Sequence, residues 1–136
     1  MTEEPIVQSS VTIPSAPEHL ARVRDVIEIT ASQIGFPVED VQRIVTAAFE
    51  AAVNAATHGS PLGPKNKITV DIRVYNDKLV VEVRDQGLGF DDNTDQEMPD
   101  ITAPRGRGIP LMRALVDDVQ FLSNDGGRVI LTKFRH

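Results

Sequence analysis

The chain has 136 residues and a formal net charge of −6, with 40% hydrophobic and 25% charged residues. These proportions are typical of a single globular domain, which buries roughly two-thirds of the surface of its unfolded chain. The acidic balance argues against direct binding to nucleic acid, because phosphate neutralisation needs a clustered basic surface. We therefore expect a protein partner or a small ligand.

Other classes are excluded by what the sequence lacks. It contains no cysteine, so it has no disulfide, no thiolate nucleophile and no cysteine-type zinc site. No apolar run approaches the roughly 18 residues of a membrane span, and the N-terminus lacks the basic-then-apolar order of a signal peptide. We expect a cytoplasmic protein with no membrane segment, whose residues 1–136 form one domain.

The first part of the chain predicts a short strand and two helices. Residues 6–13 are compatible with a strand, and residues 15–18, Ser-Ala-Pro-Glu, resemble a helical capping box with proline in the first turn. An apolar stripe of helical period follows and ends at Gly35. A second helix is expected over 39–58.

That second helix carries one carboxylate and one amide, Glu50 and Asn54, among alanines and valines. Their spacing of i and i+4 places both on one helical face. We expect this pair to lie nearly opposite the centre of the apolar arc, with Ala47 and Ala51 leaving room beside it. Because burying an unpaired charge is costly, the pair indicates a ligand, a metal or a partner, although a salt bridge or a backbone cap would also satisfy it.

The period of the sequence then changes from helical to two. Alternating apolar residues predict strands over 68–74 and 79–83, joined by a hairpin at 75–78. Residues 85–107 are irregular and rich in glycine, proline and polar residues, and so long a loop in a small domain is usually functional. The elements expected after this loop are a helix over 110–116 and strands over 119–123 and 128–134.

A glycine-rich segment follows the second of these strands. Asp85 stands at the strand end, and Gly87 and Gly89 come directly after it. Glycines allow the backbone to approach a ligand closely, and an aspartate can accept a hydrogen bond from an exocyclic amine. A plain glycine turn is the structural alternative.

A second glycine-rich segment precedes the third helix, with the order Arg105, Gly106, Arg107 and Gly108. Backbone N–H groups at the start of a helix bind anions, and neighbouring arginines can engage phosphate oxygens. A solvated basic loop is the alternative. Neither glycine segment is a Walker-type phosphate loop or a dinucleotide fingerprint.

The order of these motifs resembles one family. E-x-x-x-N-A-x-x-H beginning at Glu50, D-x-G-x-G-F beginning at Asp85 and G-x-G-I beginning at Gly106 resemble the N, G1 and G2 boxes of the ATPase superfamily of gyrase, Hsp90, histidine kinases and MutL. The resemblance covers about residues 6–134. The short length, the bare N-terminal strand and the run RGRGIPLMRALVDDV resemble the anti-sigma factor serine-protein kinase branch.

The resemblance implies a histidine-kinase-like ATPase fold. This is an α+β architecture, an α/β sandwich, in which a mixed, mostly antiparallel sheet of about five strands carries about three helices on one face. ATP would lie between the long helix and a mobile lid at about 91–105.

The resemblance also implies a role for each motif residue. Glu50 would be the general base and Asn54 a ligand of Mg²⁺. Asp85 would accept from the adenine amino group, with Gly87 and Gly89 letting the ring approach the backbone. The β- and γ-phosphates would be held by Arg105, Gly106, Arg107 and Gly108.

One position departs from the family pattern. Where the family often has Gly-Thr before the last strand, with the threonine reaching adenine through water, this chain has Gly126 and Gly127. The chain therefore lacks the side chain for that contact and keeps the aspartate. We expect His58, at the end of its helix, to pack and to match the helix dipole rather than to act in catalysis.

By the same resemblance the protein would be an ATP- and Mg²⁺-dependent serine/threonine protein kinase that binds a sigma factor. Its substrate would be a small anti-anti-sigma protein, so that partner switching regulates transcription. A homodimer paired through the first strand is expected, and Arg22 and Arg24 are candidate contacts for an acidic partner.

Two alternative functions remain open: a nucleotide-binding module that transfers no phosphate, and a regulatory kinase of another signalling system. Glu50 favours a kinase over the inactive module.

Overall fold

The computed structural model describes residues 4–33, 35–58, 66–85, 108–122 and 127–135. Apart from the start of the first helix, the predicted elements agree with those observed to within a few residues at each end. Within the described ranges, no helix combines the length and the apolar character that a bilayer-spanning segment needs. In chain order the elements are β1 (Val7–Pro14), the 3-10 turn η1 (Pro17–His19), α1 (Ala21–Ser32), α2 (Val38–His58), β2 (Lys67–Val74), β3 (Lys78–Asp85), α4 (Gly108–Leu115), β4 (Asp118–Leu122) and β5 (Arg128–Phe134).

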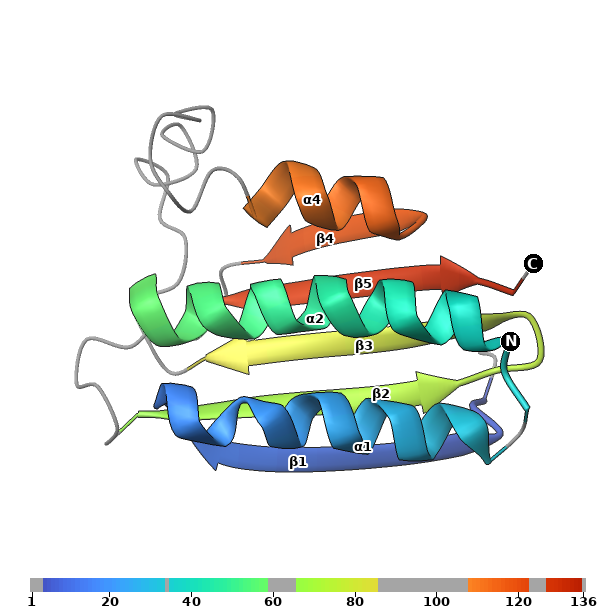
Figure 1. The fold of residues 1–136 in the computed structure, drawn as a ribbon, viewed down its shortest axis with the longest axis horizontal. Coiled ribbons are helices and arrows are strands. Elements are labelled where there is room, and N and C mark those ends of the chain that lie inside the picture. Colours follow the sequence, from blue (N-terminus) through green and yellow to red (C-terminus); the bar gives the residue numbers. More distant parts are fainter. Residues whose placement is uncertain (1–3, 34, 59–65, 86–107, 123–126, 136) are drawn as a thin grey trace.

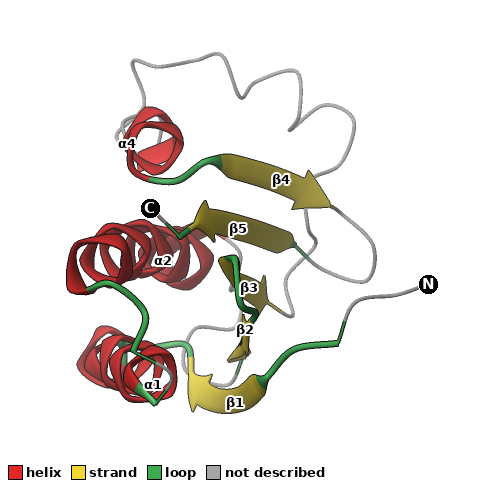
Figure 2. Ribbon diagram, turned by 90° about the vertical axis from the view of Figure 1, so that its right-hand side faces the viewer, coloured by secondary structure: helices red, strands yellow, loops and turns green. Residues whose placement is uncertain are grey.

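The strands form one sheet with the order β1-β2-β3-β5-β4. Each pairing between the described strands is antiparallel, which agrees with the expected mostly antiparallel sheet and leaves out the parallel pair that a mixed sheet would contain. Helices α1, α2 and α4 all lie on one face of this sheet, which gives two layers (Figures 1 and 2). The predicted α/β sandwich is confirmed.

The alternating strand residues build the core between these layers. Val70 pairs with Val11 on one side and with Val83 on the other, so one row of apolar side chains crosses three strands toward the helices. Helix α2 meets this face with buried small and branched residues such as Ile44 and Ala48. Burial of apolar surface of this kind is the main favourable term in folding.

The small residues of α2 have a different role from the one expected. Ala47 and Ala51, which we expected to leave room for a ligand, are 0% and 1% exposed and belong to the hydrophobic core. The reason is that α4 packs directly against α2, and Met112 of α4 is buried in the same core. Small side chains let these two helices approach closely.

The start of α1 corrects the predicted capping box at residues 15–18. The Ser15 N–H donates to the Asn66 carbonyl oxygen at 2.9 Å, which continues the pairing of β1 with β2 past the end of the strand. Ser15 thus extends the sheet, and α1 does not begin until Ala21. The chain instead forms η1, and α1 begins after Leu20, whose side chain makes no capping hydrogen bond.

The end of α1 agrees with the prediction that glycine stops it. Gly35 has a φ of 68°, and the next residue, Phe36, donates its N–H to the Ala31 carbonyl oxygen at 3.3 Å. This arrangement closes the last turn and needs a left-handed residue, for which glycine pays no steric penalty.

We expect Gly35→Ala to lower the free energy of unfolding by about 1 kcal/mol, because an L-residue is strained in the left-handed region. No atom lies within 4 Å of an added Cβ, so the change isolates backbone strain from steric clash. Urea denaturation measures the loss, and Gly35→Asn, which tolerates this conformation better, should lose less. Equal stability of Gly35→Ala and the wild type would contradict the backbone assignment.

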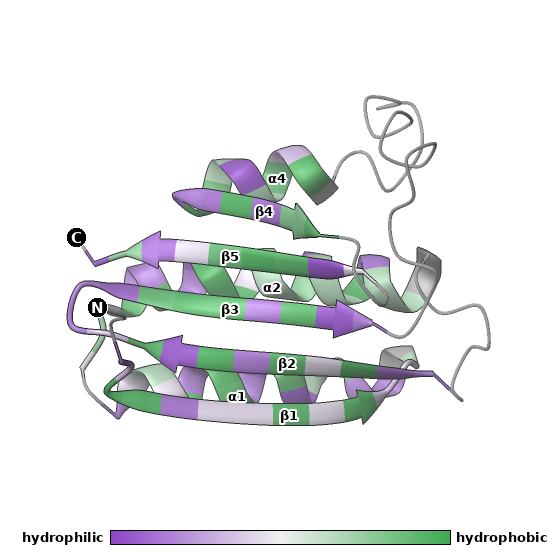
Figure 3. Cartoon of the chain, turned by 180° about the vertical axis from the view of Figure 1, so that it is seen from behind, coloured by the Kyte–Doolittle hydropathy of each residue, from purple (hydrophilic) through white to green (hydrophobic). Residues whose placement is uncertain are grey.

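The sheet face without helices, which is turned toward the viewer in Figure 3, carries a compact charge cluster. Glu82 is only 4% exposed, and its carboxylate lies 2.8 Å from Arg128 Nη2, 3.5 Å from Arg84 Nε and 3.6 Å from Arg73 Nη2. Arg84 also pairs with Asp71 at 2.9 Å. These pairs join β2, β3 and β5, and they compensate most of the charge of this face locally.

Candidate functional site

The elements that carry the predicted site residues meet at one end of the molecule. At this end β3 finishes with Asp85, β5 begins with Arg128 and α4 begins with Gly108. The C-terminal half of α2 reaches the same end, as Figures 1 and 3 show from opposite sides. The fold therefore brings the described parts of three motifs that are far apart in the sequence to one end of the sheet.

Glu50 and Asn54 lie one turn apart on α2, and both side chains are partly exposed. Asn54 follows Ala51 by three residues and Ala47 by seven, so it continues the stripe of alanines that is buried in the core. Asn54 thus lies at the edge of the buried arc and not opposite its centre as expected, whereas Glu50 lies further toward the exposed side of the helix. Because Glu50 is only half-buried, burial alone does not demand a ligand for its carboxylate.

Asp85 is held by two hydrogen bonds to one residue. Its N–H donates to the Gly127 carbonyl oxygen at 2.9 Å, and its Oδ1 accepts from the Gly127 N–H at 3.0 Å. These bonds fix the carboxylate at the end of the sheet. A carboxylate can accept about four hydrogen bonds, so this geometry is compatible with a further bond from an exocyclic amine.

Gly127 is the site residue that sequence reasoning missed. We noted it only as a departure from Gly-Thr, yet its backbone orients Asp85. A signal was present: Arg84 pairs with Arg128 in the antiparallel register, and the next pair outward is Asp85 with Gly127. A predicted register would have placed the two residues side by side.

Gly108 is the first residue of α4, so the predicted phosphate-binding turn leads directly into a helix, two residues earlier than expected. The N–H groups of a helix start are suited to an anion. The lid at about 91–105 lies outside the described residues and stays a prediction. So do the predicted site residues Gly87, Gly89, Arg105, Gly106 and Arg107.

A comparison with protein-family models decides the family. The model for the histidine kinase-like ATPase domain matches residues 13–133. The chain belongs to this family. The prediction from the three boxes is confirmed at this level, and so is the predicted use of ATP.

The proteins similar to this histidine kinase-like ATPase include several serine-protein kinases. The chain is 34% identical over 131 residues to the serine-protein kinase RsbW of Bacillus velezensis, covering 90% of this chain and 82% of that one. It is 31% identical over 137 residues to the protein of the same name from Listeria innocua, covering 92% and 85%. The predicted similarity to serine-protein kinases is confirmed.

A solved structure shows the same fold. The RsbU and RsbW domains of Rv1364c from Mycobacterium tuberculosis match with a TM-score of 0.69 at 20% sequence identity. The match covers 94% of this chain and 32% of that longer one. At this identity the likeness concerns the architecture alone.

In the part of the chain that the structure describes, few metal-ligating side chains of this histidine kinase-like ATPase lie together, which fits a magnesium ion that is bound together with a nucleotide. Among the described residues, no group of three or more His, Cys, Asp or Glu side chains could hold a metal by itself. Mg²⁺ usually keeps several waters and takes only one or two protein oxygens, the rest coming from phosphates. The amide oxygen of Asn54 can supply such a ligand.

Proposed function

We propose that this protein is an ATP- and Mg²⁺-dependent serine/threonine protein kinase and an anti-sigma factor. Its substrate would be a small anti-anti-sigma protein, and its second partner a sigma factor, so that phosphorylation regulates transcription by partner switching. The proposal is supported by the convergence of four elements, α2, β3, β5 and α4, at one end of the molecule. The chain in which they converge is 34% identical to a serine-protein kinase.

Each site residue has a defined task in this proposal. The carboxylate of Glu50 takes the proton of the acceptor hydroxyl group. The oxygen of that hydroxyl bonds to the γ-phosphorus of ATP, and ADP leaves. Asn54 would hold Mg²⁺, which would supply neutralisation of phosphate charge when bound, and Asp85 selects adenine through its amino group. The start of α4, with Arg105, Gly106, Arg107 and Gly108, holds the phosphates. Positioning and charge neutralisation of this kind supply most of the catalysis in phosphoryl transfer.

The contact with an acidic partner rests on α1. Arg22 and Arg24 are both exposed there. Arg24 Nε lies 3.5 Å from Asp25 Oδ1 and 4.0 Å from Glu28 Oε1, so its charge is compensated on its own helix. This favours Arg22 over Arg24 as the contact.

The proposal also includes a single cytoplasmic domain with an ATP lid at about 91–105, assembled as a homodimer. Strand β1 is at one edge of the sheet, and an edge strand presents backbone groups that can pair with a second copy. Sedimentation equilibrium tests the dimer directly. A monomer mass throughout the micromolar range would contradict it.

Transfer of label from γ-³²P-ATP to a candidate antagonist in the presence of Mg²⁺ tests the proposed activity. We expect label on a serine or threonine of the antagonist. ATP binding without any transfer would favour the nucleotide-binding module instead. Co-precipitation of a sigma factor, released when unphosphorylated antagonist is added, tests the second partner.

A further inference from the structure

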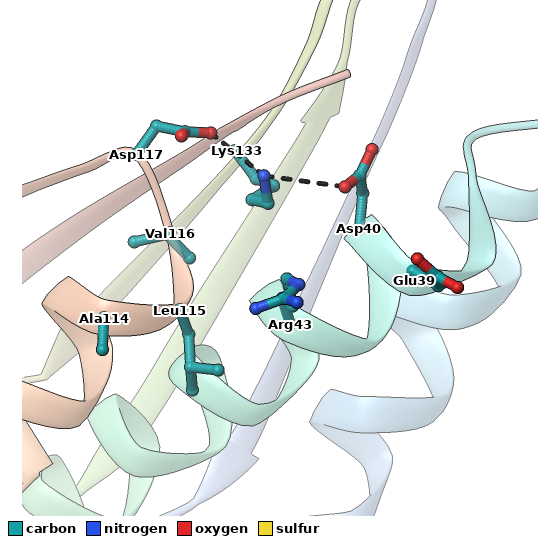
Figure 4. A pocket seen from close by; sticks show the side chains of 8 residues that line it. All are labelled: Glu39, Asp40, Arg43, Ala114, Leu115, Val116, Asp117 and Lys133. Carbon is teal, nitrogen blue, oxygen red and sulfur yellow. Dashed lines mark hydrogen bonds and ion pairs between the residues drawn. The ribbon is translucent and has the colours of Figure 1, made fainter. Parts of the chain in front are cut away.

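An ion cluster around a buried lysine lies at the end of α2 and α4 opposite the candidate site. Lys133 of β5 is 5% exposed, and its Nζ lies 3.2 Å from Asp117 Oδ2 and 3.6 Å from Asp40 Oδ1. Asp40 is in the first turn of α2, and Asp117 follows the end of α4. Figure 4 shows the ammonium between the two carboxylates. The three side chains line an open hollow of about 340 Å³. One side chain thus connects two helices and a strand.

The chain after α4 is fixed on β5 by further bonds of the same cluster. Asp117 Oδ2 also accepts from the Phe134 N–H at 2.6 Å, and the Asp117 N–H donates to the Thr132 carbonyl oxygen at 2.9 Å. Hydrogen bonds and ion pairs of this kind are directional and hold their partners in one geometry. The C-terminal end of α4 is therefore held in a fixed place.

The contact between α2 and α4 also includes apolar packing. It involves an apolar core that includes Ala47, Ala51 and Met112. The hydrophobic attraction itself is non-directional, although interdigitated side chains resist sliding of packed helices, so the ion pairs add a directional contact to this packing. Helix α4 has eight residues, which makes a short rod of about 12 Å. A shift at its C-terminal end is therefore transmitted to Gly108.

We propose that Lys133 is a positioning residue for the nucleotide site. By joining Asp40 to Asp117, it sets the axial register of α4 against α2. That register fixes the helix start at Gly108 relative to Glu50 and Asn54. The inference rests on the proposed function, because it assigns the phosphate-binding role to the start of α4.

Titration of ATP and Mg²⁺ into Lys133→Met tests this role, with phosphotransfer kinetics as a second readout. We expect the Kd and the KM for ATP to rise about tenfold, within the roughly 10²-fold cost that a displacement of 1 Å can have. The control is Val70→Ala, which truncates a fully buried residue of β2 away from α4 and should lose stability without losing affinity. Equal loss of affinity in both variants, while both are folded by circular dichroism, would overturn the positioning role.

A double variant separates positioning from stability. Lys133→Met leaves two carboxylates without the ammonium between them, so it should destabilise the fold. Adding Asp40→Asn removes one of these charges, and we expect stability to recover in part while the ATP affinity stays low. Recovery of affinity together with stability would overturn the inference.

The wild type distinguishes the failure of the two proposals. If it binds ATP but transfers no phosphate, the kinase proposal fails and the binding comparison still decides the role of Lys133. If it binds no ATP, both are overturned.

Discussion

Glu50→Gln should abolish phosphoryl transfer while ATP binding remains. We expect the transfer rate to fall by about 10² to 10⁴-fold, the usual contribution of a general base, because an amide cannot take the proton of the attacking hydroxyl. Glutamine has almost the same shape as glutamate, and position 50 is half-buried on a helix that the core holds in place. Single-turnover transfer from labelled ATP measures the loss.

The matched control for this prediction is Glu39→Gln. Glu39 is an exposed glutamate on the same helix, in its first turn and away from the site end. It should transfer phosphate at the wild-type rate. Undiminished transfer by Glu50→Gln would remove Glu50 from the role of base and would leave catalysis to positioning by the other site residues.

Asp85→Asn should weaken ATP binding by about 1–3 kcal/mol, the usual cost of a lost buried hydrogen bond. The asparagine keeps an acceptor oxygen for the Gly127 N–H, so the end of the sheet should stay intact. Its NH₂ group, however, is a donor and cannot accept from the adenine amino group. Calorimetric titration with ATP and with GTP measures the effect, and discrimination between the two bases should fall.

Asp77→Asn is the control for this titration, since Asp77 is exposed in the hairpin turn at the other end of β3. Its affinity for ATP should equal that of the wild type. If Asp85→Asn bound ATP as tightly as this control, Asp85 would not belong to the adenine site.

The sequence predicted the elements well where a local period was strong. The change from helical spacing in α2 to alternation in β2 and β3 is visible in consecutive residues, and both predictions agree with the structure. The predicted helix start at residues 15–18 was wrong, because Ser15 extends the sheet through its N–H bond to the Asn66 carbonyl oxygen and the 3-10 turn η1 precedes α1. Nothing in the local sequence shows the bond to Asn66.

The positions of the motif residues could be predicted from the sequence, but the packing around them could not. Asp85 and Gly108 stand where the motifs place them, at the end of a strand and at the start of a helix. Ala47 and Ala51 were misjudged because a small residue can make room either for a ligand or for a neighbouring helix, and only the packing of α4 decides between them. The buried Lys133 joins residues from three separate elements, so no local pattern predicts it.

A crystal structure with Mg²⁺ and a non-hydrolysable ATP analogue is the decisive test of the nucleotide site. We expect the adenine amino group within hydrogen-bond distance of the Asp85 carboxylate, Mg²⁺ on the amide oxygen of Asn54, and the phosphates at the start of α4. A nucleotide bound elsewhere, for example in the hollow beside Lys133, would show that these residues do not form the nucleotide site.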